Sequence, residues 1–161
     1  IARKELIEKA LPLPKTSKYV LHDYWISLIA SQNGKIEYIE EALIKYRQHK
    51  NNKVGSKKRS DTINSFKEMR DLFIDVKKQH FNVFIANENC FKDEEIRKLN
   101  RKSLEYFERL EKTKFINLKG WGLFFKLYKY EEFNYKMQNF LILNIPCITA
   151  MLFKIKKMIS K

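Results

Sequence analysis

The stretch KDEEIRKLNRKSLEYFERLEK, residues 92–112, decides the fold class of this chain. Small and apolar residues recur in it at helical spacing and mark one face of a predicted helix. These residues are Ile96, Leu99, Ser103, Phe107 and Leu110. The same spacing predicts an earlier helix through Ile63, Phe66, Phe73 and Val76. Ser60 or Asp61 is a suitable N-cap for it. We expect the two helices to pack as an antiparallel pair, each burying its one apolar face.

The charged residues of these two segments alternate in sign at spacings of three and four, which is typical of a solvated helix face. Glycine is scarce, with only Gly34, Gly55, Gly120 and Gly122 in the whole chain. A glycine-rich phosphate loop is therefore excluded from this sequence.

The first 34 residues predict two further helices. Residues 1–11 place Leu6, Ile7, Ala10 and Leu11 on one face, and Pro12 and Pro14 end that helix. A strongly apolar helix follows at 23–32, with Asn33 and Gly34 as its stop signal. The chain opens inside a helical pattern without an initiator methionine or a signal peptide, so we expect it to belong to a longer protein.

Residues 35–48 predict two short strands. Ile36 and Tyr38 alternate with Lys35 and Glu37, and a similar alternation returns between 43 and 48. We expect strands at 35–39 and 43–48, followed by a basic connection over residues 51–60. The predicted fold class is mainly α with this two-stranded β element, and so α+β.

Basic residues outnumber acidic ones by 33 to 19, a net charge of +14. The excess is +6 over residues 1–58, +1 over 59–112 and +7 over 113–161. Such an excess attracts polyanions or an anionic membrane surface. Cys90 and Cys147 lie far apart in the sequence, and neither has a cysteine or histidine at the spacing typical of a metal site. This indicates free thiols and favours a reducing, cytosolic compartment.

The last zone combines aromatic, apolar and basic residues. KGWGLFFKLYKY, residues 119–130, alternates aromatic residues with lysines, and the apolar run 140–153 precedes four more lysines. Asn144 and Pro146 interrupt that run, which is shorter than the roughly 20 residues a membrane span needs. Two interpretations stay open: these aromatics meet a membrane interface, or they form the core that joins this zone to the helical pair.

Residues 1–58 resemble part of a known enzyme family. IARKELIEKALPLP, residues 1–14, and HDYWISLIASQNGKIEYIEEALIKYRQHKNNKVG, residues 22–55, together resemble the C-terminal part of the catalytic domain in family 2 glycosyltransferases of the GT-A type. The closest likeness is to bacterial rhamnosyltransferase-like members that build surface polysaccharides. The chain differs from the family pattern at Tyr24 and Ala42, and it contains no Asp-x-Asp metal motif.

The resemblance implies a role for each residue of this zone. Asp23 corresponds to the general base of inverting transfer, which takes the proton of the acceptor hydroxyl. His22 and Trp25 would shape the acceptor pocket. Arg47 would pair with a donor phosphate, since arginine suits bidentate contacts. His49 would ligate or face the metal-diphosphate, and Asn51 and Asn52 would bind substrate.

The resemblance also implies cofactors and partners. The full-length enzyme would use a divalent cation, Mg²⁺ or Mn²⁺, with a nucleotide-sugar donor and a glycan or lipid-linked acceptor. We expect no cofactor in this chain alone and no activity from it. The predicted location is the inner face of the cell membrane, with the protein peripheral to it.

We therefore predict a catalytic-domain portion at 1–58 and a helical, membrane-associating extension at 59–161. Two other classes stay open. One is a basic nucleic-acid-binding module, although no known nucleic-acid-binding motif supports it and we expect no specific nucleic acid. The other is a helical interaction domain without catalysis.

Overall fold

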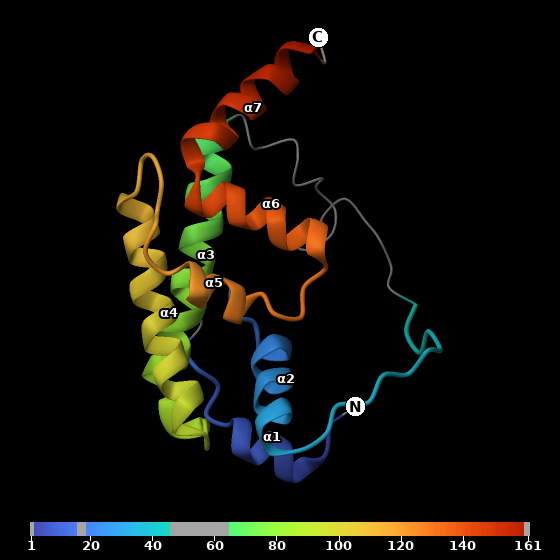
Figure 1. Ribbon diagram of the computed structural model, residues 1–161. Helices are drawn as coiled ribbons and strands as arrows, with labels where there is room; N and C mark the ends of the chain where they lie inside the picture. Colours follow the sequence, from blue (N-terminus) through green and yellow to red (C-terminus); the bar gives the residue numbers. More distant parts are fainter. Residues whose placement is uncertain (1, 16–18, 46–64, 160–161) are drawn as a thin grey trace.

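Two long antiparallel helices, α3 (Phe66–Ala86) and α4 (Glu94–Lys112), form the centre of the molecule (Figure 1). The computed structural model describes residues 2–15, 19–45 and 65–159, with side chains up to residue 155. A short 3₁₀ turn, η2 (Glu88–Cys90), lies in the connection between the two helices. The predicted antiparallel pair is thus confirmed, and the local sequence explains how each helix begins.

Each long helix begins at a side-chain cap. Ser65 accepts a hydrogen bond from the Glu68 N–H at 3.1 Å, and these two residues have the spacing of a capping box. Asp93 accepts from the Glu95 N–H at 2.8 Å and caps α4. Ser65 therefore caps α3, whereas the predicted caps Ser60 and Asp61 lie outside the described residues. Acidic residues in the first turn of α4 and basic ones in its last turn suit the helix dipole.

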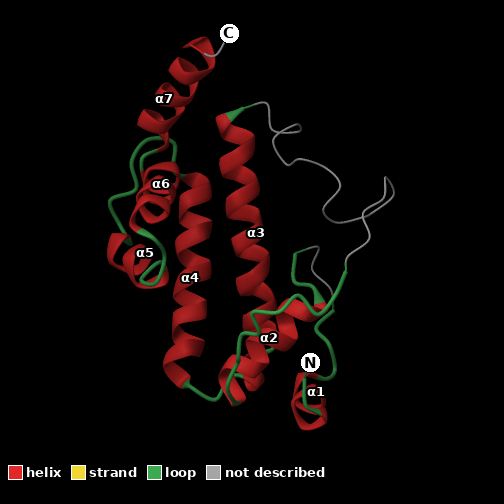
Figure 2. Cartoon of the chain, turned by 90° about the vertical axis from the view of Figure 1, so that its right-hand side faces the viewer, coloured by secondary structure: helices red, strands yellow, loops and turns green. Residues whose placement is uncertain are grey.

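The other helices pack at the two ends of this pair. Near the α3–α4 connection lie α1 (Lys4–Ala10) and α2 (His22–Asn33). At the opposite end lie α5 (Trp121–Leu127), α6 (Phe133–Asn144) and α7 (Pro146–Ile159) (Figures 1 and 2). Each end has its own hydrophobic cluster, and the partly buried Phe81 of α3 packs against both.

The cluster under α1 and α2 draws on four segments of the chain. Its buried members are Ala10, Val20, Trp25, Ile29, Val83, Phe84 and Phe91. Helix α2 ends where the sequence predicts: Gly34 makes the last helical bond, from its N–H to the Ala30 carbonyl at 2.9 Å, and its own backbone leaves the helical conformation. The two predicted helices of this zone are confirmed.

The two predicted strands are wrong. Residues 35–45 form no strand, and residues 46–48 lie outside the described part of the chain. The alternating apolar side chains do not pack on a core, since Ile36 is 60% and Tyr38 88% exposed. A strand needs a hydrogen-bonded partner, and the described residues offer none beside this segment. The described part of the chain is therefore mainly α rather than α+β.

The aromatic residues of α5 mainly belong to the core. Phe124 and Tyr128 are buried and stack on each other with ring centroids 4.4 Å apart. Trp121 is half-buried and meets the Phe140 ring edge-on at 5.0 Å. Phe125 and Tyr130 remain exposed. The core interpretation thus holds for Trp121, Phe124 and Tyr128.

A buried polar network fixes the corner between α6 and α7. Asn144 Oδ1 accepts hydrogen bonds from the Tyr106 hydroxyl at 2.9 Å and from Asn117 Nδ2 at 3.0 Å. The Asn117 N–H also donates to the Asn144 carbonyl at 2.8 Å. Burial raises the pKa of Tyr106 to about 12, against smaller opposing effects of Asn144 and Arg70. The hydroxyl thus stays a donor at neutral pH, and the α4–α5 connection is tied to this corner.

Arg70 is buried between the ends of two helices. Its Nη2 lies 2.5 Å from the Leu110 carbonyl of α4 and 3.4 Å from the Leu143 carbonyl of α6. The last carbonyls of a helix lack intrahelical donors and carry partial negative charge. Burial lowers the pKa of Arg70, while Asp71 and Tyr106 favour its charged form. Two helix ends therefore share one cation.

No single helix within the described ranges is both long and apolar enough to cross a membrane. Helices α6 and α7 reach that length and hydropathy only together, and they are bent by 109° at the break between them.

Candidate functional site

The candidate site is built on the first turn of α2. Trp25 and Ile29 are one helical turn apart and each is 1% exposed, so they anchor one face of the helix in the core. The Trp25 indole Nε1–H donates to the Ala10 carbonyl at 3.0 Å and ties α2 to the end of α1. His22 and Asp23 precede this anchor and are exposed. The site residues therefore stand at the surface on a fixed helix.

The Asp23 carboxylate is oriented by its own helix terminus. Oδ1 accepts a hydrogen bond from the Tyr24 N–H at 2.8 Å, and the Asp23 carbonyl accepts one from the Ser27 hydroxyl at 2.9 Å. The dipole of α2 also favours a negative charge in its first turn. No other described residue donates to this carboxylate, and the Asp23 side chain is exposed. Such a carboxylate can accept a proton from a bound hydroxyl group.

Tyr24 links this site to α3 through stacked rings. Its ring lies 5.1 Å from the His80 ring and 6.3 Å from the Phe84 ring, nearly parallel to both. His80 and Phe84 are themselves stacked at 6.2 Å. His80 is not among the predicted site residues, since it lies 57 positions after Asp23 in the sequence. A histidine and a phenylalanine four apart on one helical face are a weak signal of such a stack.

His80 is also held by the backbone before α2. Its Nε2 lies 3.1 Å from the Tyr19 carbonyl, which can only accept, so this nitrogen carries the proton. Burial lowers the pKa of His80, the nearby Lys77 lowers it further, and the bond to Tyr19 opposes both. The two lowering effects favour the neutral ring.

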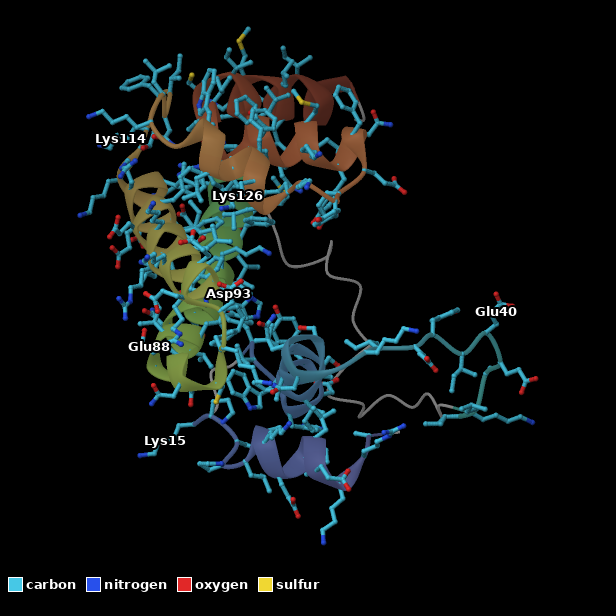
Figure 3. All side chains as sticks on the ribbon, turned by 60° about the horizontal axis from the view of Figure 1, so that its bottom comes forward. Lys15, Glu40, Glu88, Asp93, Lys114 and Lys126 are labelled. Carbon is cyan, nitrogen blue, oxygen red and sulfur yellow. The ribbon has the colours of Figure 1, made fainter. Side chains whose placement is uncertain are left out.

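The structure brings together only part of the predicted site. His22 and Asp23 are neighbours at the surface, whereas Trp25 is in the core, where it supports the helix rather than facing a pocket. Arg47, His49, Asn51 and Asn52 lie outside the described residues. Residues 35–45, with Glu40 labelled in Figure 3, extend away from the helices.

Within the ranges described, no three histidine, cysteine, aspartate or glutamate side chains gather as a metal site requires. A shallow hollow of about 350 Å³ lies near the end of α3. It is lined by Lys15, Asn82, Val83, Ala86 and Asn87. This lining offers one cation and two amides but no group that can act as a base, so the candidate chemistry stays at Asp23.

Comparison with known proteins adds no relative. No known family, curated protein or solved structure matches this chain.

Proposed function

We propose that this chain is the C-terminal part of an inverting glycosyltransferase that moves a sugar from a nucleotide-sugar to a glycan acceptor. The observation that carries the proposal is the exposed Asp23 carboxylate, oriented by the Tyr24 N–H on a helix that Trp25 anchors. The resemblance of residues 1–58 to family 2 glycosyltransferases supplies the reaction class. Bacterial surface polysaccharide synthesis is the corresponding process.

In the proposed reaction, Asp23 accepts the proton of an acceptor hydroxyl as the hydroxyl oxygen attacks the anomeric carbon. A new glycosidic bond forms on the face opposite the leaving group, and the bond to the nucleoside diphosphate breaks. His22, exposed beside Asp23, would contact the acceptor. Trp25 would act indirectly, by keeping the first turn of α2 in place.

The donor side of the site rests on the resemblance alone. Arg47, Asn51 and Asn52 would bind donor groups, and His49 would face the diphosphate with its divalent cation. The described residues supply no ligand cluster for that cation, so no step of the proposal runs through it.

The test uses the full-length protein with a panel of UDP-, GDP- and dTDP-sugars, a lipid-linked glycan acceptor and added Mg²⁺ or Mn²⁺. We expect nucleoside diphosphate release that depends on the acceptor, and a glycosidic product of inverted configuration. The present chain alone should show no tight binding of any donor by calorimetry. Micromolar donor binding by this chain alone would contradict the proposal that donor binding needs the full-length protein. A product of retained configuration would contradict Asp23 as a simple base.

A further inference from the structure

Helix α7 presents an apolar stripe to solvent. Ile148, Met151, Leu152 and Ile155 are spaced as i, i+3, i+4 and i+7, and all four are exposed, Met151 to 64%. This spacing places them on one helical face. The helix extends from the end of the molecule, and its other face meets α3, where the Phe153 and Phe66 rings lie 6.2 Å apart (Figures 1 and 2).

The α4–α5 connection exposes apolar side chains at the same corner. Phe115 and Leu118 are each 73% exposed. Asn117 lies between them and bonds to Asn144, the last residue of α6, through both its backbone and its side chain. The connection is therefore held beside the start of α7. We call Phe115, Leu118 and the four residues of the α7 stripe the corner patch.

Lysines outnumber carboxylates in residues 113–161, the segment that carries the corner patch. Lys114, labelled in Figure 3, and Lys119 flank the exposed residues of the connection in the sequence, and Lys154 is exposed on α7. Lys156, Lys157 and Lys161 follow in the sequence. Glu131 and Glu132 are the only acidic residues after position 112, and they precede α6, at the end of that helix away from the corner. The patch is thus apolar with a rim of positive charge.

We propose that the corner patch docks on an anionic membrane surface, with α7 lying in the interface. An interfacial helix buries one apolar face at the headgroup boundary while its lysines meet anionic lipid, and each such lysine contributes about 1 kcal/mol. The charge rim favours this occupant over a second copy of the chain, because two +14 chains repel each other. The surface lies mainly on the apolar run 140–153 and the connection before α5 rather than on the aromatic residues of α5, and the proposal is independent of sugar transfer.

The test is cosedimentation of this chain with two kinds of vesicle. One contains equal parts of phosphatidylcholine and phosphatidylglycerol, and the other contains phosphatidylcholine alone. We expect binding to the first that weakens with salt, and little binding to the second. The double variant Met151→Ser/Leu152→Ser should bind at least about tenfold more weakly, because it removes two apolar side chains from the interface. Lys154→Glu should lose about tenfold or more through charge reversal.

The matched control is Phe133→Ser. Phe133 is also a large exposed apolar residue on a helix, but it lies at the start of α6, away from the corner. We expect this variant to bind as the unchanged chain does, and all variants to keep the same circular dichroism and melting temperature within a few degrees.

Three results would overturn the proposal. They are equal binding to neutral and anionic vesicles, unchanged binding of the double variant, and a dimer in solution that the double variant converts to monomers. The last would make a second copy of the chain the occupant of the patch. None of these results bears on sugar transfer, so the two proposals fail separately.

Discussion

Gly120 and Gly122 lie two residues apart, and alanine at each should change stability in opposite directions. Gly120 has φ +97°, a conformation that costs a residue with a side chain about 1–2 kcal/mol. A Cβ there would lie 2.7 Å from Cδ2 of Tyr106. The Tyr106 ring cannot yield easily, because it is buried and its hydroxyl is bonded to Asn144.

The clash adds about 1–3 kcal/mol, as overpacking in a core does, so Gly120→Ala should lose about 2–5 kcal/mol in total. A loss of about 3 kcal/mol lowers the melting temperature by roughly 6–12 °C in a chain of this size. Gly122 is exposed in the first turn of α5, and a Cβ there meets nothing within 4 Å. Gly122→Ala should therefore gain about 0.5–1 kcal/mol, since alanine favours the helix.

The assay is chemical unfolding of both variants, followed by circular dichroism, with thermal melts as a second reading. If Gly120→Ala proves as stable as Gly122→Ala, α5 does not pack on α4 as described, and the assignment of Phe124 and Tyr128 to the core loses its support.

Two further changes probe the surroundings of the candidate site. Trp25→Phe should lower the free energy of unfolding by about 2–3 kcal/mol, because it removes buried volume and leaves the Ala10 carbonyl without its indole donor. Urea titration measures this free energy. An unchanged value would refute the anchoring role of Trp25. The folded state holds the pKa of His80 below its ordinary value, chiefly through burial, so the unfolded chain binds the proton more readily. Stability should therefore be full above about pH 6.5 and fall as the pH drops below it. His80→Gln should weaken that fall, and identical slopes for the two proteins between neutral and mildly acidic pH would show that His80 does not contribute.

The sequence predicted the helices well where one apolar stripe marks the buried face. The stripe ending in Phe107 and Leu110 is buried in one cluster with Ile74 of α3 and with residues of α5 and α6, and the proline stops are local. Residues 35–39 fail for the opposite reason. Their alternation marks one possible face of a strand. A strand also needs a neighbouring strand to pair with, and the local sequence does not show whether one is present.

The candidate site divides in the same way. Asp23 at a helix start is a local feature, and the sequence places it correctly. The stack of Tyr24 on His80 depends on how α2 lies against α3, and a pattern along the chain does not contain that information. The sequence also left open whether Phe124 faces lipid or core, since a buried aromatic and an interfacial one have the same composition. Packing decides it, with Phe124 fully buried and Met151 exposed.

The central claim is that Asp23 is the base of sugar transfer, and the most direct measurement is transfer by Asp23→Asn in the full-length protein. Asp93→Asn is the matched control, because Asp93 is also an exposed aspartate at a helix start and asparagine caps equally well. We predict that Asp23→Asn lowers kcat by about a hundredfold or more while the donor Kd changes by less than about twofold, since only proton acceptance is lost. Asp93→Asn should retain normal transfer. Near-normal kcat in Asp23→Asn would remove Asp23 from the mechanism and contradict the account.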